Sequence, residues 1–138
     1  MKRTTVPYPL VRKIAAHIIG HYLPRSKEYQ LGLYFVGERE MIRLNRQFFK
    51  RDYATDVIAS PVERESDLPV VALGDVFVCT GTARRQAREY GHSYREEIAL
   101  LTTHGILHLL GYDDLKAAAR KKMRAEEKKV LKAVLGNK

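Results

Sequence analysis

Cysteine is almost absent from this sequence: Cys79 is the only one in 138 residues. A single cysteine excludes an intramolecular disulfide, and a buried thiol is the state we expect for it. Long hydrophobic runs are missing as well, because basic residues and histidines interrupt the most apolar N-terminal stretch, residues 11–23. That interruption argues against both a transmembrane helix and a signal peptide. We therefore expect a cytoplasmic protein with no membrane partner.

Internal repeats and linkers are also missing from the sequence. A chain of 138 residues has an ordinary length for one domain, and it can bury a core without disulfides or a structural metal. Its composition, 45% hydrophobic and 30% charged, is that of a globular protein. We therefore predict one domain spanning residues 1–138.

Acidic residues are scarce relative to basic ones. The sequence has 16 Asp and Glu against 25 Lys and Arg, which gives a formal net charge of +9 and a pI near 9.8. The basic excess is spread over several segments, with the largest share in residues 115–138, so it does not form one amphipathic membrane anchor. Any single cluster can be a solvated helix face. The imbalance of the whole chain predicts a polyanionic partner, and nucleic acid fits better than an anionic membrane.

The spacing of apolar residues predicts several helices and short strands. Helical spacing covers residues 9–23, 38–48, 80–90, 93–111 and 115–135, and strand patterns cover residues 29–36, 55–59 and 70–79. Residues 61–69, between the last two strands, have the composition of a loop. Gly74 predicts a bulge or a close approach within its strand.

Three helix signals can be checked individually. Thr80 or Thr82 is expected to cap the third helix, and Ser93 with Glu96 matches the capping box that begins the fourth. The last helix is expected to bury a stripe that consists of Leu115, Ala119, Met123, Val130 and Val134.

The fourth predicted helix carries two histidines, His104 and His108, on one face because they are four residues apart. Two imidazoles in this arrangement can hold one metal ion. Gly111 can end the helix in a left-handed conformation that turns the chain back, so that Asp114 becomes a third ligand. Three protein ligands with one open position are typical of a catalytic zinc, whereas a structural zinc usually has four. The pattern therefore favours metal-dependent hydrolysis.

The two histidines have two other interpretations. The first, a structural role, stays open, and the second, a zinc protease, can be argued against. Histidines four apart in an apolar stretch can also be core or helix-end residues. A zinc protease would place a general-base glutamate directly after the first histidine of its HExxH motif. Gly105 occupies that position and has no side chain to act as a base. We expect this glycine to allow another backbone to pack closely instead.

The motif HGILHLLGYD at residues 104–113 resembles the signature of the YbeY family of bacterial ribosomal-RNA maturation endoribonucleases. Shorter matches occur at residues 44–45, 55–58 and 74–76, and the likeness covers nearly the whole chain. The resemblance implies an α+β fold: one domain with a small mixed β-sheet packed by about five α-helices, one of them a zinc-hydrolase-like metal helix.

The resemblance also implies a function. The implied function is that of a metal-dependent, single-strand-specific endoribonuclease with one zinc ion (Zn²⁺), acting in ribosomal RNA maturation and ribosome quality control. Its expected partners are single-stranded ribosomal RNA and the ribosomal small subunit or assembly proteins. Two other functions remain open: a non-catalytic ribosome-assembly or RNA-binding factor with a structural metal, and a metal-dependent hydrolase of another substrate.

This sequence departs from the family pattern at three positions. The third ligand is usually a histidine, and Asp114 in its place widens the choice to other divalent ions. The family arginine six residues before the Thr-Asp-Val strand corresponds to Phe49, so nearby Arg51 or Lys50 is expected to supply the positive charge. Ser60 stands where the family usually has an aromatic residue before proline, which is expected to alter the groove floor.

The resulting mechanistic hypothesis assigns His104, His108 and Asp114 to a metal whose bound water attacks a phosphodiester phosphorus. Asp113 is the catalytic candidate for orienting that water; Asp75 is a weaker one, with a turn or hydrogen-bonding role favoured. Whether water or the RNA 2′-hydroxyl attacks is left open.

Substrate binding is assigned to residues near the end of the second predicted helix. Arg51 is expected to hold a substrate phosphate and to contribute to catalysis, and Lys50 is a second phosphate-binding candidate. Tyr53, and also Phe49 and Tyr112, are candidate stacking platforms for RNA bases, although core packing is favoured for Tyr112.

Overall fold

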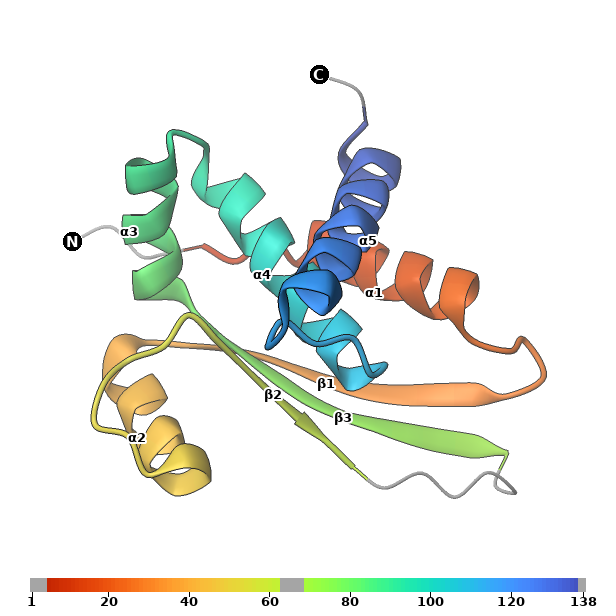
Figure 1. The fold of residues 1–138 in the computed structure, drawn as a ribbon, viewed down its shortest axis with the longest axis horizontal. Coiled ribbons are helices and arrows are strands. Elements are labelled where there is room, and N and C mark those ends of the chain that lie inside the picture. Colours follow the sequence, from red (N-terminus) through yellow and green to blue (C-terminus); the bar gives the residue numbers. More distant parts are fainter. Residues whose placement is uncertain (1–4, 63–68, 137–138) are drawn as a thin grey trace.

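The computed structural model describes residues 5–62 and 69–136. Their elements, in chain order, are α1 (Tyr8–Tyr22), β1 (Glu28–Val36), α2 (Glu38–Phe49), β2 (Val57–Pro61), β3 (Val70–Cys79), α3 (Thr80–Tyr90), α4 (Tyr94–Leu109) and α5 (Ala117–Leu135). Figure 1 shows α1, α3, α4 and α5 on one side of the sheet and α2 on the other. The predicted α+β fold is confirmed. Residues 63–68 of the predicted loop lie outside the described residues.

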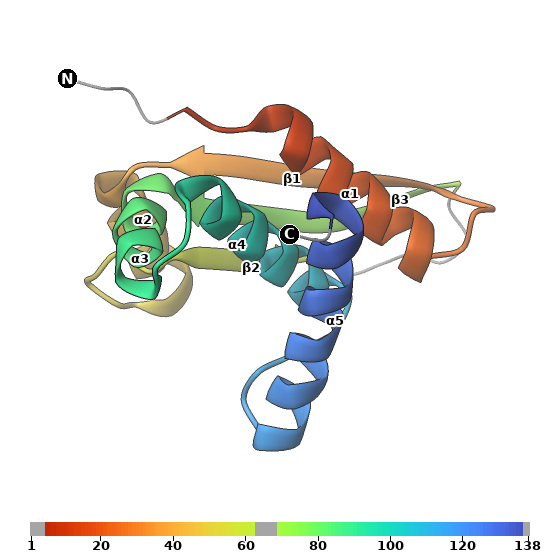
Figure 2. The ribbon, with the colours of Figure 1, turned by 90° about the horizontal axis from the view of Figure 1, so that it is seen from above.

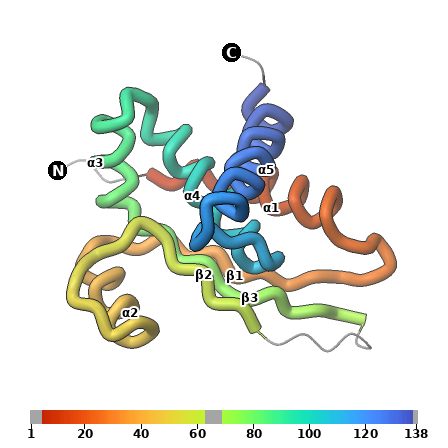
Figure 3. Tube along the Cα trace, in the orientation of Figure 1, coloured from red at the N-terminus to blue at the C-terminus, as the bar shows by residue number. Residues whose placement is uncertain are grey.

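The three strands form a mixed sheet in the order β1-β3-β2. β1 runs parallel to β3, and β2 runs antiparallel to it, so β3 is central and β2 is an edge strand (Figure 3). The irregularity predicted at Gly74 is confirmed, because Gln30 pairs with Ala72 whereas Leu31 pairs with Gly74. Gly74 has φ +130°, and a side chain there would collide with the carbonyl oxygen of Ser60.

Helix α4 is the central helix of the packing. It contacts α1, α3 and α5 as well as β2 and β3, and Figure 2 shows it between α3 and α5 above the sheet. A Cβ at Gly105 would lie 2.5 Å from Val76 Cγ1 and 3.1 Å from Val57 Cγ2. The close packing predicted at Gly105 is therefore found, but its neighbours are side chains rather than another backbone. The glycine lets the histidine-bearing helix approach the sheet.

A smaller apolar cluster lies on the other side of the sheet. Met41 and Leu44 of α2 pack there against Ile58 of β2 and the thiol of Cys79. The predicted burial of Cys79 is confirmed, since its side chain is inaccessible to solvent. This cluster holds α2 beside β2, and it thereby positions the segment that follows α2.

The expected threonine cap of α3 is wrong. Cys79 occupies the N-cap position and Thr80 is already helical, with its hydroxyl donating to the carbonyl oxygen of Val36 at 3.3 Å. Thr82 instead directs its hydroxyl to the sulfur of Cys79 at 3.3 Å. The physical reason is that β3 continues into α3 without a loop, so the last strand residue takes the cap position.

The capping box of α4 is confirmed. The backbone N–H of Glu96 donates to Ser93 Oγ at 3.0 Å, and the N–H of Ser93 donates to Glu96 Oε1 at 3.0 Å. These reciprocal bonds satisfy two N–H groups that helix geometry leaves without a partner.

The predicted stripe of α5 needs two corrections, at Ala119, which is only half-buried, and at Leu115. Leu115 is 85% exposed because it precedes the helix, in the turn between α4 and α5. The buried residues of α5 are Met123, Glu127, Val130 and Val134. A carboxylate therefore shares the apolar face of this helix. Among the described helices, none combines the length and apolar character needed to cross a bilayer.

Candidate metal centre

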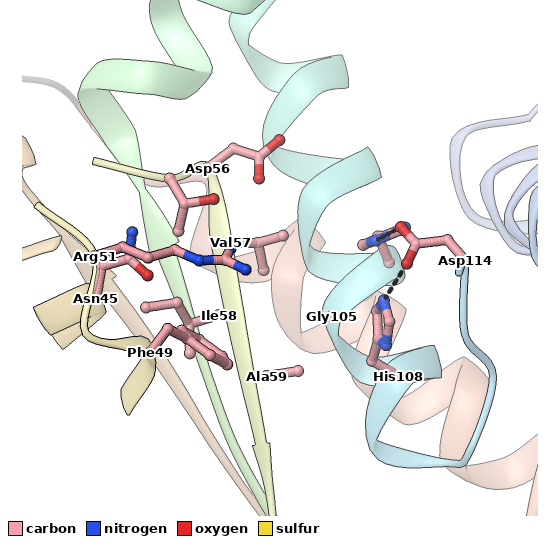
Figure 4. Close-up of a pocket in the computed structure, with 12 residues that line it drawn as sticks. Asn45, Phe49, Arg51, Asp56, Val57, Ile58, Ala59, Gly105, His108 and Asp114 are labelled. Atoms are coloured by element: carbon pink, nitrogen blue, oxygen red, sulfur yellow. Dashed lines mark ion pairs between the residues drawn. The ribbon is translucent and has the colours of Figure 1, made fainter. Parts of the chain in front are cut away.

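The two histidines lie on successive turns at the C-terminal end of α4, and the chain then reverses. Gly111 has φ +105°, and the N–H of Tyr112 donates to the carbonyl oxygen of Leu107 at 3.1 Å. This left-handed turn is the one that the sequence predicts after the helix. It returns Asp114 to the side of α4 that carries His104 and His108 (Figure 4).

The three side chains present their donor atoms to a common point. Asp114 Oδ2 lies 3.5 Å from His104 Nε2, and Asp114 Oδ1 lies 3.7 Å from His108 Nε2. All three donor atoms lie within 4.8 Å of one another. Tetrahedral bonds of about 2.1 Å place ligand atoms about 3.4 Å apart, so the donor set fits a metal ion. Both imidazoles are partly accessible rather than enclosed in the core.

A fourth residue, Glu127 of α5, orients one of the histidines. Its Oε2 hydrogen-bonds to His104 Nδ1, and its side chain is only 10% exposed. With Nδ1 engaged in this way, Nε2 is the nitrogen left to face Asp114. A carboxylate behind a ligating histidine fixes the orientation and tautomer of the ring.

Sequence reasoning missed Glu127, although a signal was present. It follows Met123 by four residues and precedes Val130 by three, which is the spacing of the predicted buried stripe. A glutamate on that stripe must find a partner when it is buried.

The two histidines differ in their proton affinity. Burial alone would lower the pKa of His104, but the hydrogen bond and charge of Glu127, with the charge of Asp114, outweigh it and raise the pKa above its usual value. Burial and the neighbouring His104 lower the pKa of His108, and the charge of Asp114 opposes them only in part. A metal ion must therefore displace a more tightly held proton from His104 than from His108.

The histidines open into a pocket of about 440 Å³. His104, His108 and Asp114 belong to one wall, Phe49 and Arg51 belong to the opposite wall, and β2 runs between them (Figure 4). The guanidinium carbon of Arg51 lies 5.6 Å from the centre of the Phe49 ring. A positively charged group thus faces the candidate ligands across the pocket.

The residues predicted to bind substrate do not all line the pocket. Arg51 lines the pocket, and its Nη1 donates to the hydroxyl of Tyr53 at 3.3 Å. Tyr53 is 53% exposed and does not itself line the pocket. Lys50 ends α2 in a left-handed conformation with φ 55°, and its side chain is also outside the lining. Tyr112 packs against the core and contacts Tyr22.

The predicted catalytic aspartates do not line this pocket. Asp113 Oδ1 accepts a hydrogen bond from the N–H of Leu115 at 3.2 Å, in the turn after α4. Asp75 lies on the sheet face opposite to Val76, the residue that meets Gly105. The carboxylate that does line the pocket is Asp56, which accepts a hydrogen bond from Gln86 at 3.3 Å. Its position before β2 in the matched Thr-Asp-Val segment was the available signal.

Known proteins resemble this chain in sequence and in fold. The model of the family described as Endoribonuclease YbeY matches residues 2–135. Endoribonuclease YbeY of Staphylococcus carnosus is 40% identical over 108 residues, covering 74% of this chain and 70% of the relative. The protein of the same name from Lacticaseibacillus casei is 36% identical over 132 residues, covering 91% of this chain and 86% of the relative.

A solved structure also resembles this chain in fold. The solution structure of TM1509 from Thermotoga maritima superposes with a TM-score of 0.67 at 28% identity, covering 94% of this chain and 84% of that one. The match of the family model over almost the entire length, together with these relatives, identifies the chain as a member of the Endoribonuclease YbeY family.

Proposed function

We propose that this protein is a metal-dependent endoribonuclease that cleaves single-stranded ribosomal RNA during ribosome maturation and quality control, in the cytoplasm. The observation that carries the proposal is the convergence of His104, His108 and Asp114 on one side of a pocket whose other side holds Arg51. Family membership supports the RNA-cleaving activity. The net charge of +9 supports a polyanionic substrate.

In this proposal each wall of the pocket has its own task. His104, His108 and Asp114 would hold a single divalent ion, and Glu127 keeps Nε2 of His104 directed at it. Such an ion supplies Lewis acidity and a bound water that loses its proton near neutral pH. Arg51 holds a non-bridging phosphate oxygen from the opposite wall, for which a guanidinium is suited because it forms paired hydrogen bonds.

We propose zinc as the ion, because two imidazoles and one carboxylate form a familiar donor set for zinc. The carboxylate oxygen of Asp114 also accepts harder ions such as Mn²⁺ and Mg²⁺. Elemental analysis of the purified protein identifies the ion directly.

The enzyme hypothesis is tested by His108→Ala together with metal removal. We expect this variant to stay folded, because its imidazole is partly exposed and forms no part of the apolar core. It should bind single-stranded RNA but not cleave it, and chelation should abolish cleavage by the wild type. Cleavage that continues unchanged after complete metal removal would reject the proposal.

Two alternative functions give different outcomes in the same experiment. An assembly factor with a structural metal would lose its fold or its RNA affinity in His108→Ala, without any cleavage by the wild type. A hydrolase of small molecules would show no salt-sensitive RNA binding, because only phosphate contacts release counterions. Product ends distinguish the attacking group: a cyclic phosphate with a 5′-hydroxyl contradicts attack by water.

A further inference from the structure

The hydrogen bonds between β2 and β3 show which residues of the edge strand β2 direct their main-chain groups toward β3. The N–H of Cys79 donates to the carbonyl oxygen of Asp56 at 2.8 Å, and the N–H of Val62 donates to the carbonyl oxygen of Leu73 at 3.3 Å. The register places Ile58 opposite Phe77 between these two bonds. Since hydrogen-bonded and non-hydrogen-bonded pairs alternate in an antiparallel ladder, the even-numbered residues of this segment bond to β3.

The odd-numbered residues therefore direct their main-chain groups away from β3. Val57 and Ala59 point both N–H and C=O toward the free side of β2, where no strand is paired in residues 5–62 and 69–136. Pro61 also faces away from β3, so its missing N–H removes no hydrogen bond between the two strands. The free edge of β2 thus offers two amide donors and their neighbouring carbonyl acceptors.

This free edge forms the floor of the pocket beside the candidate metal ligands. Val57, Ile58 and Ala59 line the pocket together with His108 and Arg51. Figure 4 shows β2 passing between the wall of α4 and the wall that carries Phe49 and Arg51. A ligand that reaches from one wall to the other must cross the main chain of Val57 to Ala59.

We propose that this edge binds a nucleobase of the RNA substrate through main-chain hydrogen bonds, with Ala59 as the central residue. The inference rests on the function proposed above. An outward-facing residue presents a donor and an acceptor side by side. The Watson–Crick edge of an unpaired base presents the complementary donor and acceptor, and such edges are how single-stranded RNA is recognised.

An extended peptide is the other ligand that a strand edge can bind. Strand addition depends on a row of main-chain bonds along the edge. β2 is five residues long, and Pro61 removes one of its outward donors, which leaves only Val57 and Ala59. Arg51 on the opposite wall and the net charge of +9 also favour a polyanion. A single base needs only one of the two donor–acceptor pairs.

The consequence is a physical basis for single-strand selectivity. A base that is paired in a duplex has its Watson–Crick edge occupied, so it cannot bond to the floor of the pocket. The main chain then selects for unpaired nucleotides with little preference among the four bases, because each has an adjacent donor and acceptor on that edge.

The test uses the full-length metal-loaded protein and an oligouridine, compared with the same oligomer built from N3-methyluridine. The methyl group removes the donor of the Watson–Crick edge and leaves the phosphates unchanged. We expect affinity and cleavage to fall about tenfold on methylation, the loss expected for about 1.4 kcal/mol of hydrogen bonding.

Ala59→Pro removes the outward N–H alone, in a position where edge strands accept proline. This variant loses the bond from the Ala59 N–H to a uracil carbonyl oxygen but keeps the Ala59 carbonyl that accepts from N3–H. It should bind the unmodified oligomer about tenfold more weakly than the wild type does. Ala59→Gly keeps both main-chain groups and should keep the wild-type affinity. Circular dichroism and thermal unfolding verify the fold of each variant, and the wild-type comparison stands even if Ala59→Pro is unfolded.

Equal affinity for both oligomers and equal cleavage of both by the wild type would overturn the inference, and the proposed nuclease activity would still stand. Failure of the wild type to cleave the unmodified oligomer would instead count against the proposed function. Displacement of bound RNA by an uncharged extended peptide at comparable concentration would show that the edge binds peptide, and it would also overturn the inference.

Discussion

Glu127 of α5 hydrogen-bonds through Oε2 to Nδ1 of His104 on α4, 23 positions earlier in the chain. The bond joins the basic C-terminal helix to the candidate metal centre. It leaves the other ring nitrogen, Nε2, 3.5 Å from Asp114. The position of α5 therefore decides how His104 is presented.

Replacing Glu127 with Gln should weaken metal binding without removing a ligand. The amide keeps most of the side-chain shape but loses the charge that makes the imidazole a stronger donor, so we expect metal affinity to fall about 10- to 100-fold. Competition with a chromophoric chelator measures the change. Glu126→Gln is the matched control, because that neighbouring glutamate bonds to Tyr22 instead. Equal metal affinities in the two variants would contradict a positioning role for Glu127.

The close packing of α4 on the sheet predicts a cost for Gly105→Ala. The added Cβ would lie 2.5 Å from Val76 Cγ1, so we expect a net destabilisation of about 1–3 kcal/mol despite the better helix propensity of alanine. Urea unfolding measures it. Gly20→Ala in α1 is the control: nothing lies within 4 Å of its Cβ, and it should stabilise by about 0.5–1 kcal/mol. An unchanged free energy of unfolding in Gly105→Ala would mean that α4 can move away from the sheet to make room for the added methyl group.

The pocket wall opposite the ligands predicts how RNA binding depends on salt. Arg51→Gln should raise the KM for single-stranded RNA and reduce the slope of log affinity against log salt by about one, the loss of one phosphate contact. Filter binding at several salt concentrations measures both. Phe49→Arg introduced into Arg51→Gln should restore much of the affinity, because the two side chains line the same wall. An unchanged slope in Arg51→Gln would place the phosphate contact elsewhere.

The contact between α1 and α5 predicts a pH-dependent contribution to stability. The hydroxyl of Tyr22 donates to Glu126 Oε1 at 2.6 Å, and this bond holds the pKa of the Glu126 carboxyl below its usual value. A carboxyl whose pKa is lower in the folded state stabilises the fold above its unfolded pKa, and that contribution is lost as the pH falls through the folded pKa.

Tyr22→Phe should therefore lower the free energy of unfolding at pH 7 by about 1 kcal/mol, a low value because the pair is partly accessible to solvent. The difference from the wild type should shrink below about pH 4, where glutamate takes up its proton. Urea unfolding from pH 3 to 8 checks this. A difference that stays constant over the whole range would assign the effect to ring packing instead of the charge.

Several features could be predicted from sequence because each depends on residues close together in the chain. Helix geometry places His104 and His108 on one face, and a glycine with positive φ turns the chain back toward them. The Ser93 and Glu96 capping box lies within a single helical turn. The failures have a local cause too: Leu115 continues the apolar spacing of α5, but the turn that returns Asp114 leaves it outside the helix.

The amino-acid sequence by itself determined the helix and strand pattern, the three donor residues and the basic character of the chain, because these follow from short-range periodicity, turn chemistry and composition. Only the tertiary structure decided which groups surround those donors. Glu127 arrives from α5, Arg51 and Phe49 arrive from the end of α2, and the main chain of β2 forms the floor between them. Such contacts depend on how distant segments pack, and residue spacing along the chain carries no direct measure of that distance.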